Sequence, residues 1–111
     1  MRRTTEVLAQ EGFGIITQID VTETFKKKLG IEFRNYRILG ACNPNMAHQA
    51  LGIEPRAGAM LPCNVIVRAV ADGVEVSAID PVASMAAIEN DRLKAVAGEV
   101  REMLRAVVAS I

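Results

Sequence analysis

The two cysteines lie in nearly mirrored settings, Cys42-Asn43-Pro44 and Pro62-Cys63-Asn64, and they are the only cysteines in the chain. Cys42 ends one apolar segment with strand character, and Cys63 begins another. If these strands pair in an antiparallel manner, both sulfur atoms lie at the same end of one sheet. The asparagines beside the cysteines can hydrogen-bond the backbone or a ligand. These residues therefore predict a binding site at that end of the sheet, made by Cys42, Asn43, Cys63 and Asn64.

The dipeptide Asn43-Pro44 also predicts the start of a helix directly after Cys42, because asparagine is a good N-cap and proline fits the first helical turn. The partial positive charge of that helix end would favour the thiolate form of Cys42. Backbone N–H groups at the turn could receive an anion. The opposing interpretation is that free cysteines commonly pack as small hydrophobic side chains. Both interpretations stay open on the sequence.

His48, the single histidine, falls in the second turn of the same helix and could point toward the cysteines. Cysteine, histidine and the nearby methionines Met46 and Met60 would together suit a soft metal such as Cu(I). A Cys–His nucleophile pair would need an orienting third group, which the sequence does not identify. The cysteine spacing matches neither C-x-x-C nor a zinc pattern. We therefore count His48 as a ligand-binding candidate and assign no metal ligand and no catalytic residue.

The segments around these residues alternate between helix and strand character. Strands are expected at 14–19, 36–42, 61–71 and 74–79, and helices at 4–11, 21–29, 44–51, 81–88 and 91–111. Helices and strands interleave first, and a hairpin and two helices follow. This order predicts an α+β fold, a mainly antiparallel four-stranded sheet with helices packed on one face.

Two expectations concern the faces of the sheet. In the first strand, alternation places Ile15 and Ile19 on one face and Ile16 on the other. A two-residue turn at Asp72-Gly73 is a strong hairpin signal. Its register pairs apolar residues on the buried face: Ala71 with Val74, Ala69 with Val76, and Val67 with Ala78.

The composition restricts the classes of function. The chain has 111 residues, half of them hydrophobic, which suits a single domain with its own core. Its 13 basic residues balance 13 acidic ones and only 4% of residues are aromatic, which argues against nucleic-acid binding. No apolar run approaches the roughly 20 residues that span a bilayer, and the N-terminus lacks the apolar stretch of a signal peptide. We therefore expect a cytoplasmic protein with reduced cysteines and no membrane partner.

The combination of four motifs, ILGACNP (38–44), LPCNV (61–65), FKKKLG (25–30) and SAIDP (77–81), resembles the domain-of-unknown-function 302 family. The resemblance covers nearly the whole chain, and it implies that the recurrent polar positions of the family correspond here to Cys42, Asn43, Pro44, Cys63 and Asn64, which adds Pro44 to the candidate site. It implies a TATA-binding-protein-like topology and a homodimer, and topology alone transfers no DNA binding. Members have no agreed activity, and they occur in contexts that hint at sulfur or metal handling.

Relative to the family, the chain looks shortened at its N-terminus within a single domain, 1–111, because members usually begin with a strand and a longer first helix. A missing strand would leave an open sheet edge, which a second copy could cover. The resulting hypothesis is a non-catalytic domain that binds a small ligand or a sulfur species near Cys42 and Cys63, with no cofactor identified. A structural or interaction module with inert cysteines is the alternative. A thiol-based enzyme and a soft-metal binder are weaker ones, so enzymatic activity stays open.

Overall fold

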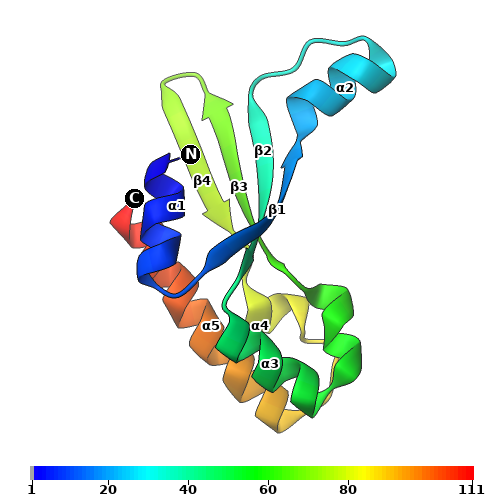
Figure 1. The fold of residues 1–111 in the computed structure, drawn as a ribbon, viewed down its shortest axis with the longest axis vertical. Helices are drawn as coiled ribbons and strands as arrows, with labels where there is room; N and C mark the ends of the chain where they lie inside the picture. The colour runs from blue at the N-terminus through cyan, green and yellow to red at the C-terminus, as the bar shows by residue number, and fades with distance from the viewer. Residues whose placement is uncertain (1) are drawn as a thin grey trace.

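A computed structural model describes residues 2–111 and contains a four-stranded antiparallel sheet with the strand order β1-β2-β3-β4 (Figure 1). The α+β class predicted from the sequence is therefore confirmed. The elements follow in the order α1 (Arg2–Gln10), β1 (Gly14–Asp20), α2 (Val21–Leu29), β2 (Tyr36–Cys42), α3 (Pro44–Ile53), the 3₁₀ helix η1 (Pro55–Met60), β3 (Cys63–Val70), β4 (Gly73–Ala78), α4 (Pro81–Ser84) and α5 (Asp91–Ser110).

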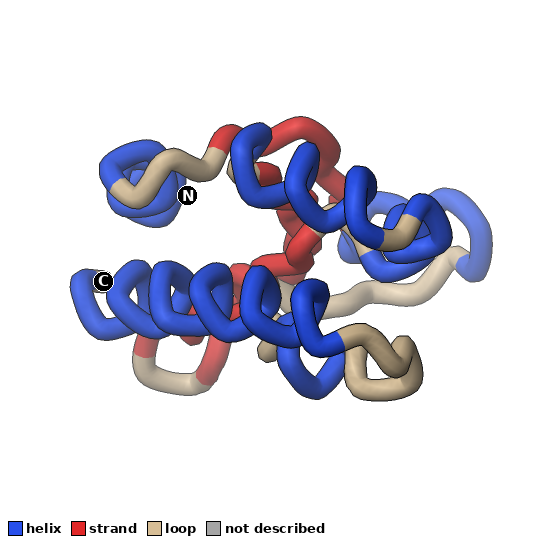
Figure 2. The backbone as a smooth tube through the Cα atoms, turned by 90° about the horizontal axis from the view of Figure 1, so that it is seen from below, coloured by secondary structure: helices blue, strands red, loops and turns tan. Residues whose placement is uncertain are grey.

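The sheet fills one half of the molecule, while α3, η1 and α4 gather beyond one end of it (Figure 1). The long helix α5 runs along both halves and holds them together through contacts with α1, α3, α4 and β4. Figure 2 shows α1 and α5 as neighbours, with both ends of the chain on the same side. The guanidinium of Arg3 donates a hydrogen bond of 2.9 Å to the carbonyl of Ser110 across these two ends.

The core lies between one face of the sheet and the helices. Leu39, Val65 and Val67 alternate along β2 and β3 and are buried on that face. Helix α5 supplies the opposing surface, as its apolar repeat predicts, through the buried side chains Leu93, Val96, Ala97, Val100, Leu104 and Val107. No helix in the described part of the chain is long and apolar enough to cross a bilayer.

Strand β1 departs from simple alternation, because a β-bulge interrupts its pairing with β2. Ile15 pairs with Ala41 and Thr17 with Gly40, which leaves Ile16 without a partner in the ladder. Ile15 therefore packs against the core, whereas Ile19 lies opposite Ile38 and is exposed. The prediction that Ile15 and Ile19 share a face is wrong, because one extra residue reverses the phase of everything after it.

The β3–β4 hairpin has a different register from the predicted one. Val70 pairs with Gly73, so the two-residue turn is Ala71-Asp72 rather than Asp72-Gly73. Ala69 consequently pairs with Val74, and each residue's partner moves by two positions. A shift of two keeps every side chain on the predicted face, because the side-chain period of a strand is two.

Candidate functional site

Antiparallel pairing of β2 with β3 brings the two cysteines to one end of the sheet. Ala41 lies opposite Cys63, and Cys42 follows as the last residue of β2. The chain then turns directly into α3, which Asn43 caps. The shared end that the sequence predicts for the two thiols is therefore present in the fold.

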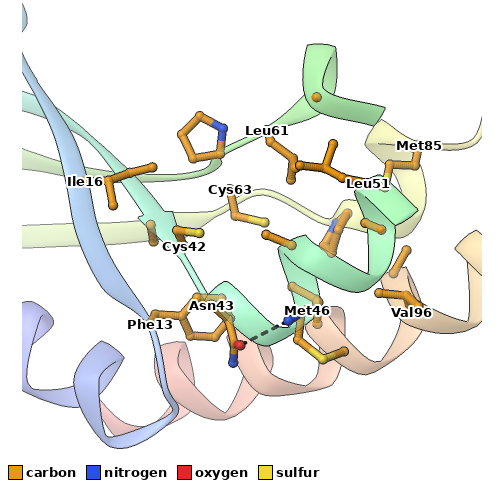
Figure 3. A pocket seen from close by; sticks show the side chains of 18 residues that line it. Phe13, Ile16, Cys42, Asn43, Met46, Leu51, Leu61, Cys63, Met85 and Val96 are labelled. Carbon is orange, nitrogen blue, oxygen red and sulfur yellow. Dashed lines mark hydrogen bonds between the residues drawn. The ribbon is translucent and has the colours of Figure 1, made fainter. Parts of the chain in front are cut away.

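A cavity of about 350 Å³ lies between this end of the sheet and the helices beyond it. Cys42 and Cys63 both line it, and Figure 3 shows their side chains next to each other on its wall. Met46 of α3, Met85 at the end of α4 and Val96 of α5 close the other sides. The cavity thus joins residues from the middle, the first half and the last quarter of the sequence.

The lining of the cavity is almost entirely apolar. Of its 18 lining residues, all within the described range, none carries a side chain with a full charge at neutral pH, and Asn43 brings the only amide. Ile16 and Leu51 line the cavity and are nevertheless 62% and 40% exposed. These two side chains therefore mark an apolar opening toward solvent.

Asn43 uses its side chain to hold the start of α3. Its Oδ1 accepts a hydrogen bond of 3.3 Å from the N–H of Met46, drawn as the dashed line in Figure 3. Its Nδ2 lies 3.9 Å from the sulfur of Met103, and a Cβ added to Gly12 would come within 3.0 Å of the same nitrogen. The amide is thus packed between α5 and the α1–β1 turn, with the geometry of an N-cap.

The two thiols differ in burial. Cys63 is 7% exposed and Cys42 is half-buried, and both are free. Burial, together with the neighbouring Cys42, raises the pKa of the Cys63 thiol above its ordinary value. Cys63 consequently stays protonated at neutral pH, and Cys42 is the more accessible of the two.

Three of the residues selected from the sequence do not line the cavity. Pro44 occupies the first turn of α3 and is exposed, and His48 is exposed on the same helix. Asn64 lies opposite Gly40 on the other face of the sheet, because it directly follows Cys63, which faces the helices. The structure therefore brings Cys42, Asn43 and Cys63 together and leaves Pro44, His48 and Asn64 outside this group.

Some of the cavity's wall had no signal in the sequence. Ile16 reaches it through the bulge in β1, and Met85 and Val96 reach it from helices far along the chain. Gly40 lies just outside the wall, where a Cβ would come within 2.7 Å of the Cγ of Pro62. A glycine inside an otherwise apolar strand is the one local hint of such close approach.

The arrangement offers packing surface and four sulfur-bearing side chains, those of Cys42, Cys63, Met46 and Met85. A base within hydrogen-bond reach is one means of activating a nucleophilic cysteine, and among the lining residues of the described chain there is none. Within residues 2–111, no three His, Cys, Asp or Glu side chains come together in a group that could hold a metal ion.

Comparisons with known proteins agree with this fold. A family model described as "Domain of unknown function DUF302" matches residues 1–111. The crystal structure of an uncharacterized conserved protein DUF302 from Bacillus stearothermophilus is similar, with 30% sequence identity, a TM-score of 0.91, and coverage of 98% of this chain and 85% of that chain. No curated protein matches significantly. The chain therefore belongs to the DUF302 family.

Proposed function

We propose that this protein is a non-catalytic binding domain that takes a small ligand or a sulfur species in the cavity beside Cys42 and Cys63. The observation that carries the proposal is the placement of both thiols on the wall of one cavity of about 350 Å³. Ligand sites in proteins are commonly clefts of about 300–1,000 Å³ with mostly hydrophobic walls and few polar groups. Two free thiols also fit a reducing compartment such as the cytoplasm.

The exposed apolar opening supports the same proposal. Large hydrophobic side chains on a surface mark contact sites when they gather around a concavity. Ile16 and Leu51 stand at this opening on opposite walls, one on β1 and one on α3. Asn43 supports the site by fixing the start of α3, and Pro44, His48 and Asn64 remain candidates only for the outer surface around it.

Alkylation with iodoacetamide at neutral pH tests the proposal. We expect Cys42 to be modified at least about tenfold faster than Cys63, because only a thiolate with access to solvent attacks the reagent. Raising the pH should speed the reaction of Cys63, since its raised pKa leaves little thiolate at neutral pH. Peptide mapping by mass spectrometry measures both rates.

The variants Cys42→Ser and Cys63→Ser assign each rate to its residue, and alkylation in denaturant gives the intrinsic reactivity of both thiols. Complete inertness of both cysteines in the folded protein would instead support the alternative of a structural module with core thiols. Turnover of a substrate that disappears in Cys42→Ser would support a thiol enzyme.

We also propose that the protein forms a homodimer through the arm made by α2 and the segment that follows it. None of the residues of α2 is buried, and Leu29 is 65% exposed. Ile31 and Phe33 beyond it are exposed as well. The ring of Phe33 packs edge-on against that of Phe25, with 5.0 Å between the ring centroids. The radius of gyration is 15.0 Å, against about 13 Å for a compact domain of this length, and the arm is one of the parts that extend from the sheet in Figure 1.

Replacing Leu29 with glutamate should convert the dimer to a monomer, because a charge at the centre of an apolar interface loses its solvation. Analytical ultracentrifugation measures the change. Val108→Glu is the control, since Val108 is exposed on α5, away from the arm. A monomeric wild-type protein contradicts the dimer, and dissociation by Val108→Glu alone would move the interface to the C-terminal helix.

A further inference from the structure

We propose that the ligand of this cavity is an uncharged, mainly apolar small molecule, held by contact with apolar side chains and the two thiols. This inference rests on the proposed binding function and names the class of molecule that the site accepts. It follows from the apolar surface of the wall and from the lack of charged side chains among the lining residues, all of which lie within the described range.

A charged ligand finds no partner on the wall. The lining residues of the described chain include no Lys, Arg, His, Asp or Glu. A charge moved from water into such surroundings loses its hydration without an ion pair to replace it. Carboxylates, phosphates and ammonium groups are therefore disfavoured inside, whereas each apolar group that enters is stabilised by about 25 cal/mol per Å² of buried surface.

The helix N-terminus beside Cys42 does not supply an anion site either. Pro44 at the first helical position has no N–H group. The N–H of Met46 donates a hydrogen bond to the Oδ1 of Asn43. The N–H of Ala47 donates one of 2.9 Å to the backbone carbonyl oxygen of Asn43. Asn45, whose N–H is the remaining one of this turn, is exposed and lies outside the lining. Within this turn, the N–H groups of Met46 and Ala47 are thus already bonded, and the remaining one belongs to a residue outside the lining.

The polar capacity of the wall is small for the same reason. The side-chain oxygen of Asn43 already accepts a hydrogen bond from the N–H of Met46, and its side-chain nitrogen packs against the sulfur of Met103. Cys63 remains a neutral thiol, since burial raises its pKa. What remains for a ligand is an apolar surface with four polarisable sulfur atoms, those of Cys42, Cys63, Met46 and Met85, which suits an apolar or sulfur-containing molecule.

A matched pair of fluorescent probes tests the inference. N-phenyl-1-naphthylamine is uncharged, and 8-anilinonaphthalene-1-sulfonate has the same ring skeleton with an added sulfonate. We expect fluorescence titration of the wild-type protein to give a Kd at least about tenfold lower for the uncharged probe, because the sulfonate would be buried without a partner. The uncharged probe should also slow the alkylation of Cys42 about tenfold at saturation.

Two variants locate the probe. Ala47→Leu places a larger side chain in the cavity and should weaken binding of the uncharged probe at least about tenfold. Ala95→Leu is the control, because Ala95 is exposed on α5 and does not line the cavity. The Kd of this variant for the uncharged probe should equal that of the wild type. Leu51→Lys adds a cation at the opening and should shift the preference toward the sulfonate about tenfold, without filling the cavity.

Each outcome separates this inference from the proposed function. Equal or tighter binding of the sulfonate by the wild type would overturn the inference, and selective alkylation of Cys42 would leave the proposed function standing. Binding of neither probe would also overturn it. Binding of the uncharged probe without protection of Cys42 would also overturn the inference, because the probe would then not contact the thiols of this cavity.

Discussion

Replacing Leu104 with alanine is expected to lower the free energy of unfolding by about 2–5 kcal/mol, the largest effect of any change considered in this protein. Leu104 is 2% exposed and lies in the core, on the face of α5 that covers the sheet. Its truncation removes apolar contacts and leaves a cavity that neighbouring strands cannot fill by shifting. Urea denaturation followed by circular dichroism measures the change.

Val108→Ala provides the control on the same helix, one turn further along. Val108 is 40% exposed, so its truncation should change the free energy of unfolding by no more than about 0.5 kcal/mol. Comparable losses in the two variants would mean that α5 does not present the face described above, and the assignment of the core would then fail.

The sequence was sufficient to predict the fold class and most helix starts, because these depend on local chemistry. Asp20 accepts a hydrogen bond of 3.0 Å from the N–H of Glu23, and Gly30 closes the same helix in the left-handed conformation. Asn43 and Asp80 cap their helices in the same manner, each followed by proline. Such signals are contained in three or four consecutive residues, and no tertiary contact is needed to interpret them.

The errors arose where two local solutions are equally compatible with the apolar pattern. Turns at Ala71-Asp72 and at Asp72-Gly73 put the same residues on the same face, so the pattern cannot choose between them. The bulge at Ile16 inserts one residue without a distinctive sequence, since Ile15 and Ile16 are both isoleucine and the pattern does not say which of them faces the core. In both cases the pairing with a neighbouring strand determines the register, and the local sequence does not contain that pairing.

In the candidate site, too, some features follow from the local sequence and others depend on tertiary packing. Strand phase and pairing place Cys42 and Cys63 at one end, and this could be worked out from the sequence. Asn64 was selected because it is polar and directly follows Cys63, yet adjacent residues in a strand point to opposite faces. His48 was selected because it falls in the helix that begins after Cys42, and it lies exposed on that helix. The apolar walls come from α4 and α5, whose approach depends on the packing of the whole core. The residue types in the sequence thus pointed to the two thiols, whereas the apolar character of the wall around them becomes clear only in the fold.

Replacing Gly40 with alanine is expected to lower the free energy of unfolding by about 1–3 kcal/mol, through overpacking rather than through loss of contacts. A Cβ at this position would overlap the Oγ1 of Thr17, and it would lie 2.7 Å from the Cγ of Pro62 and 3.3 Å from the Cβ of Thr17. The Thr17 hydroxyl can rotate away, but the ring of Pro62 is stiff, so the segment before β3 that carries it must move. Because Pro62 lines the cavity, the same variant should also change the alkylation rate of Cys42.

Gly98→Ala is the matched control, because nothing lies within 4 Å of a Cβ added at Gly98 in α5. Alanine there should raise the free energy of unfolding by about 0.5–1 kcal/mol, since it restricts the unfolded chain and favours the helix. The two identical substitutions are thus expected to act in opposite directions, which thermal or urea unfolding measures directly. A neutral Gly40→Ala variant with an unchanged Cys42 rate would show that β1, β2 and the Pro62 segment are not packed closely, and the wall of the cavity beside Cys42 would then be wrongly placed.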